Sequence, residues 1–177
     1  AQKVTGREAR HSLGALTAAF SGPAPGPSDG LRLPPDPERL AAAPYHAFHQ
    51  MGVERRRADT IRRAAREAPR LERLARFDAE QGMRRLVSLP GVGEWTAAET
   101  VALSHGHPDA VPVGDFHVPN TVAWLLATEP RGDDRRMLEL LEEFRPQRGR
   151  VIRLLEATGG RAPAFGPRLP VRSITGI

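Results

Sequence analysis

The chain has 177 residues, a formal net charge of +5 and a sequence pI of about 11.0. Lys3 is its only lysine, so the other basic residues are all arginines, and it contains no cysteine. The lack of cysteine excludes disulfides, thiolate zinc sites, catalytic thiols and iron–sulfur clusters bound by cysteine. No apolar run approaches the roughly 20 residues of a membrane span, and no signal-peptide pattern is present. We therefore expect a soluble, intracellular protein with a polyanionic partner.

The first predicted helix covers residues 6–20, where apolar side chains recur at helical spacing. Residues 21–35 are rich in glycine, proline and serine, and we expect them to form a loop. Asp36 then caps a short helix at 37–43, with Pro37 at its first position. Because the chain begins with Ala and already shows a helical pattern, we expect that an N-terminal part is missing.

Further helices are predicted over residues 45–51 and 53–66. The stretch 54–76 contains nine arginines and four acidic residues, an excess of one sign beyond what pairing within a helix needs. Such a run is either a solvated helix surface or a surface that faces phosphate groups, and the sequence leaves both interpretations open.

A tight turn, Leu-Pro-Gly-Val-Gly at 89–93, separates two more helical patterns at 77–86 and 96–103. Gly91 and Gly93 can adopt positive φ and lack a Cβ, so another backbone can come close. Their N–H groups would face outward at the start of the next helix, where the helix dipole favours an anion. In so basic a chain, a DNA phosphate is the expected anion; the alternative is an ordinary turn between two helices.

Beyond a loop at 105–112, helices are predicted over 118–127, 134–144 and 149–157. Asp115 directly precedes the first of these, which carries Pro119 in its first turn. A carboxylate in this place is held ionised by the helix dipole, although a plain helix cap has the same pattern. No alternating strand pattern occurs, so the predicted fold class is all-α. The predicted domain covers residues 1–158, with the hairpin at about 79–104, and is followed by an irregular basic tail at 159–177.

The sequence Leu-Pro-Gly-Val-Gly-x-Trp-Thr-Ala at 89–97, together with an aspartate some twenty residues later, resembles the helix-hairpin-helix DNA glycosylase superfamily. Within it, the chain is most similar to the 3-methyladenine DNA glycosylase II family, from about Gln2 to about Ala157. The resemblance implies a two-lobed helical fold with the active cleft between the lobes. It also implies a base-excision repair enzyme that releases alkylated purines, such as 3-methyladenine, from damaged double-stranded DNA. A monomer in the cytoplasm, associated with the nucleoid, would be usual for such an enzyme.

Site residues follow from the resemblance. Asp115 is the implied catalytic carboxylate. The implied base-pocket residues are Trp95, Phe116 and Glu99, and the implied DNA-backbone contacts are Gly91, Gly93, Thr96 and Arg148. Backbone carbonyls of Val87, Leu89 and Val92 are implied as ligands of a monovalent cation; no other metal, no diffusible cofactor and no iron–sulfur cluster is expected.

The sequence departs from the family pattern at three positions. Glu99 and Glu156 stand where relatives can carry aromatic residues, which leaves the preferred lesion open, and Lys3 stands where a DNA-wedging side chain is expected. Bifunctional relatives place a lysine just after the hairpin, whereas this chain has Trp95 there, so we expect no AP-lyase activity. The alternative function is a non-catalytic helix-hairpin-helix DNA-binding domain.

Overall fold

The computed structural model describes residues 4–27, 30–160 and 162–163. These residues form helices and loops with a single isolated antiparallel bridge, between Pro23 and Arg32, which confirms the predicted all-α fold class. Lys3 and most of the predicted tail, residue 161 and residues 164–177, lie outside the described residues. The chain divides into two compact units between Glu72 and Arg73, and each is described by itself. No described helix is long and apolar enough to cross a membrane.

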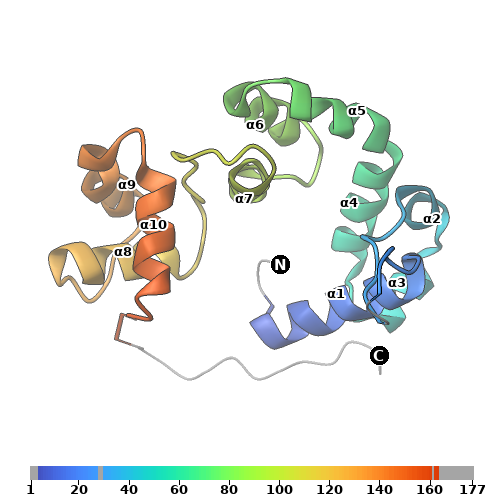
Figure 1. Ribbon diagram of the computed structural model, residues 1–177. Coiled ribbons are helices and arrows are strands. Elements are labelled where there is room, and N and C mark those ends of the chain that lie inside the picture. Colours follow the sequence, from blue (N-terminus) through green and yellow to red (C-terminus); the bar gives the residue numbers. More distant parts are fainter. Residues whose placement is uncertain (1–3, 28–29, 161, 164–177) are drawn as a thin grey trace. The chain divides into compact units, whose positions relative to one another are not determined.

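The first unit consists of five helices and their connections (Figure 1). They are α1 (Gly6–Phe20), α2 (Pro37–Ala42), α3 (Tyr45–Gln50), α4 (Arg55–Arg66) and α5 (Ala68–Glu72). A capping box opens α1: the hydroxyl of Thr5 accepts the N–H of Glu8, and the Glu8 carboxylate accepts the N–H of Thr5. As predicted, Asp36 caps α2 by accepting the N–H groups of Glu38 and Arg39.

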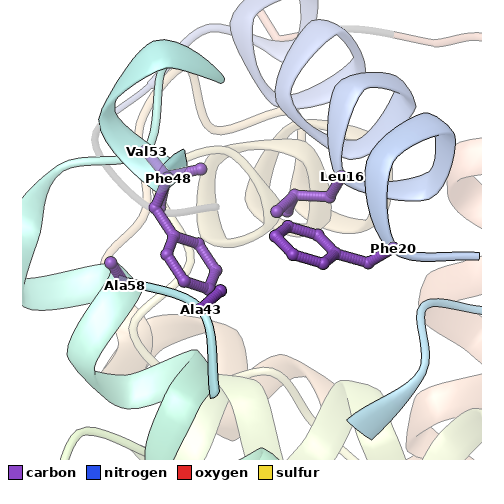
Figure 2. Close-up of a cluster of buried hydrophobic side chains, with 6 residues drawn as sticks. All are labelled: Leu16, Phe20, Ala43, Phe48, Val53 and Ala58. Carbon is purple, nitrogen blue, oxygen red and sulfur yellow. The ribbon is translucent and has the colours of Figure 1, made fainter. Parts of the chain in front are cut away.

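The core of the first unit is built around two phenylalanines. Figure 2 shows Leu16 and Phe20, from α1, directed toward Phe48 of α3. The Phe20 and Phe48 rings are stacked, with centroids 5.7 Å apart and planes at 24°. Burying a side chain as large as that of Phe48, which has no exposed surface, stabilises the fold by about 2–3 kcal/mol. The remaining buried members of the cluster are Ala43, Val53 and Ala58.

The basic stretch contains more helix than the sequence predicts. The predicted helix ends at Arg66, but α5 and a 3₁₀ turn, η1 (Arg73–Arg76), follow it. Neither piece has the apolar periodicity that would reveal it, and Pro69 lies in the first turn of α5, where a missing N–H does no harm. The ion pair of Arg55 with Asp59 on α4 is long, at 3.9 Å, and both side chains are exposed, so it contributes little to stability.

The second unit begins with η1 and contains a helical hairpin and a cluster of three helices (Figure 1). The hairpin helices are α6 (Ala79–Val87) and α7 (Glu94–Ser104); the cluster comprises α8 (Val118–Ala127), α9 (Asp134–Leu141), the 3₁₀ turn η2 (Glu142–Phe144) and α10 (Arg148–Ala157). The buried core of the cluster consists of Val111, Val118, Val122, Met137, Leu141 and Ile152. The loop between α7 and α8 supplies Val111, so the core also fixes the segment that leads to Asp115.

Candidate active site

The turn of the hairpin has the geometry that its sequence requires. The N–H of Val92 donates to the carbonyl of Leu89 at 3.0 Å, with Pro90 and Gly91 between them. Gly91 has φ 95°, as the third residue of a type II turn must, and this position favours glycine strongly. Gly93 differs from the expectation: its φ is −97°, which any residue can adopt. A Cβ at Gly93 would meet no atom within 4 Å, so the isolated protein does not require glycine there.

The N-terminus of α7 lies beside this turn and has no side-chain cap. Within the described residues, the N–H groups of Gly91 and Gly93 donate to no backbone carbonyl. Thr96, in the first turn of α7, is exposed. Donors arranged in this way suit a phosphate oxygen, although the exposed carboxylate of Glu94 in the same turn opposes an anion.

Asp115 is held by hydrogen bonds to both of its carboxylate oxygens. Oδ1 accepts the N–H groups of His117 at 2.6 Å and Val118 at 2.9 Å, which caps the start of α8. Oδ2 accepts the indole N–H of Trp95, and the Nε1–Oδ2 distance is 2.9 Å. A carboxylate has about four acceptor positions, so one position on Oδ2 remains for a water molecule or a sugar. Asp115 is therefore a helix cap and also an oriented anion with free acceptor capacity.

The structure brings Trp95 and Asp115 together, as a shared site requires, and the bond between them joins the hairpin to the helix cluster. Trp95 is half-buried, and its indole N–H is used in the bond to Asp115. Phe116 is 79% exposed and contacts the His117 ring edge-on, at 5.0 Å between centroids. An aromatic ring this exposed beside an oriented carboxylate offers stacking surface for a planar ligand.

Several residues that the sequence analysis did not single out fix the loop carrying Asp115. Asp134, at the start of α9, accepts the N–H of Gly114 at 3.1 and 3.2 Å. Asp109 accepts the backbone N–H of Arg148 at 2.9 Å and thereby caps α10 from a distant part of the chain. Gly149 permits close approach, because a Cβ there would lie 2.6 Å from the carbonyl oxygen of Ala110. No local sequence pattern could reveal contacts over such separations.

Arg148 has a structural partner. Its Nε and Nη2 bind the two oxygens of Asp109 at 2.9 and 2.6 Å, and the side chains of Arg148 and Asp109 are only 13% and 11% exposed. Burial raises the pKa of Asp109, but the hydrogen bonds and charge of Arg148 outweigh it and lower that pKa below 3.8. The prediction that Arg148 contacts the DNA backbone stays a prediction, and the geometry supports a structural role better.

The two glutamates that depart from the family pattern meet at one arginine. Arg153 of α10 donates from Nη2 to Glu99 at 2.9 Å and from Nη1 to Glu156 at 3.4 Å. The hydrogen bond to Glu99 raises the pKa of Arg153 above its ordinary value. Glu99 therefore does not simply face solvent; its carboxylate is fixed on the same helix as Trp95.

The predicted monovalent-cation site stays a prediction. The carbonyl of Leu89 already accepts one N–H, from Val92, which leaves it a second lone pair. No group of three or more histidine, aspartate or glutamate side chains that could bind a metal occurs within the described ranges. Beside the hairpin, an open and mainly apolar groove is lined by Glu80, Met83, Arg84, Val87 and Glu94. This groove does not include Trp95 or Asp115.

Comparison with known proteins identifies the family that this chain matches. Residues 3–147 match the model of the HhH-GPD superfamily base excision DNA repair protein. Over 65 residues, 36% of this chain and 23% of the relative, the sequence is 38% identical to DNA-3-methyladenine glycosylase 2 of Escherichia coli. A relative from Bacillus subtilis is 25% identical over 122 residues, 67% of this chain and 42% of its own length. The chain thus spans less than half the length of the curated relatives it matches.

Solved structures share the fold. A 3-methyladenine DNA glycosylase from Archaeoglobus fulgidus superimposes with a TM-score of 0.73 at 23% identity, covering 87% of this chain and 52% of that one. The Schizosaccharomyces pombe 3-methyladenine DNA glycosylase Mag1, in complex with abasic DNA, gives a TM-score of 0.74 at 19% identity, covering 89% and 75%. By the extent of the family match, with a fold that agrees, the chain belongs to the HhH-GPD superfamily of base-excision DNA repair proteins.

Proposed function

We propose that the protein is a monofunctional DNA glycosylase that hydrolyses the N-glycosidic bond of alkylated purines in duplex DNA. The observation that carries the proposal is Asp115, whose two oxygens are fixed by α8 and by Trp95 while one acceptor position stays free. The names of the relatives and the DNA-bound neighbour support the same substrate class.

Hydrolysis of the glycosidic bond of an alkylated purine requires few catalytic groups beyond an oriented carboxylate such as Asp115. A purine alkylated at N3 or N7 is cationic, so its glycosidic bond is weakened and the leaving group needs no strong acid. An ionised carboxylate can stabilise the positive charge that develops on the sugar and can orient the attacking water. The C–N bond breaks with its electron pair leaving on the base, water adds to the sugar carbon, and Asp115 accepts the proton that the water loses.

Binding is proposed to use the hairpin and the exposed aromatic ring. The amides of Gly91 and Gly93, with Thr96, would hold a DNA phosphate at the N-terminus of α7. Taking the damaged base out of the stack costs a few kcal/mol, which stacking on Trp95 and Phe116 would offset. The reaction needs no diffusible cofactor, and the chain acts as a monomer on damaged duplex DNA.

The test is the release of free bases from methylated duplex DNA, identified by mass spectrometry. The parent protein should release 3-methyladenine or 7-methylguanine above the spontaneous rate, and Asp115→Asn should not. A control, Asp133→Asn, changes another aspartate that caps a helix in the same unit, that of α9, and should leave release unchanged. If the parent protein releases no base yet binds duplex DNA in a salt-dependent way, the non-catalytic DNA-binding domain becomes the better account.

A further inference from the structure

Glu99 lies on the side of α7 that carries the candidate site. It follows Trp95 by four residues, so the two side chains share one face of the helix. Trp95 reaches Asp115 from that face. The Glu99 side chain is 30% exposed, which leaves part of its carboxylate accessible.

Arg153 holds this carboxylate by one oxygen. Its Nη2 binds Oε2 of Glu99 across 54 residues of sequence, from α10 to α7. In the described part of the chain, Oε1 of Glu99 accepts no hydrogen bond. Oε1 is thus a fixed acceptor that could take an N–H of a purine edge.

The charges around this acceptor do not cancel. Among Asp115, Glu99, Glu156 and Arg153, three carboxylates stand against one guanidinium. A surplus of negative charge beside a partly desolvated site stabilises a cationic base and offers a neutral base no comparable gain. Selection would therefore rest on charge in addition to shape.

A glutamate in place of an aromatic ring also removes stacking surface. A site that binds mainly by stacking accepts many flat bases, because every base has a π face. With Glu99 and Glu156 at these positions, only Trp95 and Phe116 provide stacking surface. Neutral lesions therefore lose more binding energy than cationic ones, which the negative charge still attracts.

We propose that Glu99 is a specificity-determining residue that makes the protein select cationic N-alkylpurines over neutral damaged purines, and that Arg153 is the positioning residue that fixes it. This inference rests on the proposed glycosylase function and deepens it.

The experiment compares single-turnover release from duplexes that each contain one lesion: 7-methylguanine, which is cationic, or hypoxanthine or 1,N6-ethenoadenine, which are neutral. Spontaneous loss is subtracted. The readout is the ratio of cationic to neutral release rates. Glu99→Gln keeps the shape but removes the charge, and the ratio should fall roughly tenfold. Glu139→Gln is the matched control: it removes the charge of an exposed glutamate paired with Arg135 and Arg136 on α9 and should leave the ratio unchanged.

Arg153→Lys keeps the charge but loses the planar fork that bridges two glutamates, so it tests positioning separately. Because the lysine would hold Glu99 less firmly, we expect the ratio to fall about threefold. The thermal midpoint of unfolding is measured alongside. A lower midpoint with an unchanged ratio would show that Arg153 is merely structural and overturn its assigned role.

The outcomes separate this inference from the proposed function. If the parent protein releases bases and Glu99→Gln slows all three lesions by the same factor, the selectivity inference is wrong while the glycosylase function stands. If the parent protein releases none of the three bases nor any base from methylated DNA, the function itself has failed, and the inference with it.

Discussion

At the scale of single residues, the bond between Trp95 and Asp115 is the central feature. A side-chain hydrogen bond from the indole N–H orients the Asp115 carboxylate. The same carboxylate caps α8 through its other oxygen, so one residue serves the fold and the site together. Asp115→Asn would keep the cap through Oδ1 but would turn an NH₂ group toward the indole N–H.

Trp95→Phe separates the ring from its N–H group. It keeps most of the aromatic surface and removes the donor to Asp115, so base excision should slow about tenfold. Single-turnover kinetics at saturating protein would measure the loss. Trp124→Phe changes the other tryptophan of the chain and serves as the control. Equal rates for Trp95→Phe and the parent protein would show that the hydrogen bond does not matter for excision.

The family resemblance implied which side chains belong to the candidate site, and their roles in it stay predictions. Asp115, Trp95 and Phe116 come from two short segments whose meeting the sequence resemblance implied. The ion pairs of Arg148 with Asp109 and of Arg153 with Glu99 could not be predicted, because each joins residues 39 or more positions apart. In the sequence, a buried arginine paired with a distant carboxylate cannot be distinguished from an arginine that faces DNA.

At the scale of elements, the two glycines of the hairpin differ in what the fold requires of them. Gly91 needs its positive φ for the turn, whereas Gly93 has an ordinary φ and open space around a Cβ. Gly93 therefore makes physical sense if a ligand backbone comes close to it.

The two glycines should respond differently to alanine. Gly91→Ala should lower the free energy of unfolding by about 1 kcal/mol because the residue has φ 95°. Gly93→Ala should leave it nearly unchanged, since the lost N-cap preference is offset by a less flexible unfolded chain. Its affinity for duplex DNA should nevertheless fall roughly tenfold through steric exclusion, a loss of about 1.4 kcal/mol. Denaturant titration and fluorescence anisotropy measure the two quantities. Unchanged DNA affinity of Gly93→Ala would argue against a phosphate at the turn.

The stability contributed by the Asp109–Arg148 pair, which joins α10 to the loop before α8, should depend on pH. The Asp109 carboxylate has a pKa below its unfolded value of 3.8, so its contribution to stability is full above that value and is lost as the pH falls through the lower, folded pKa. Asp109→Asn should lower the free energy of unfolding by about 2 kcal/mol at pH 7, because Arg148 loses its partner.

The difference between Asp109→Asn and the parent protein should shrink as the pH falls below 3.8 and approach zero only below the lower, folded pKa, where Asp109 is neutral in both states. Thermal unfolding at several pH values measures it. Asp134→Asn, which changes the other carboxylate that holds this loop, shows how much of the effect is specific to the buried pair. A difference that stayed constant from pH 7 to acid would exclude the ion pair as its cause.

The helices themselves were largely predictable, because caps and apolar spacing are local. Asp36 and the proline that follows it predicted α2, and apolar residues at helical spacing predicted α1 and α8. The piece from Ala68 to Arg76 was missed, since its apolar residues are too few to show a period.

At the scale of the whole molecule, the near absence of lysine limits the chemistry. A bifunctional glycosylase attacks the sugar with an amine and then cleaves the strand, and Lys3 is the only lysine side chain available in the sequence. We therefore expect base release without strand cleavage.

Borohydride trapping tests this expectation, because it reduces a Schiff base to a stable protein–DNA adduct. The parent protein should give no adduct above the level of Lys3→Arg while it converts damaged sites into intact abasic sites. An adduct that disappears in Lys3→Arg would reveal amine catalysis and contradict the monofunctional mechanism.

The central claim is that Asp115 performs the chemistry and does more than cap α8. The most direct measurement is the single-turnover rate of base release by Asp115→Asn, with its DNA affinity determined on the same sample. We predict a loss of at least about a hundredfold in rate, with affinity equal or higher because one negative charge is gone. A rate close to that of the parent protein, with an intact fold, would show that Asp115 is only a helix cap and contradict the account.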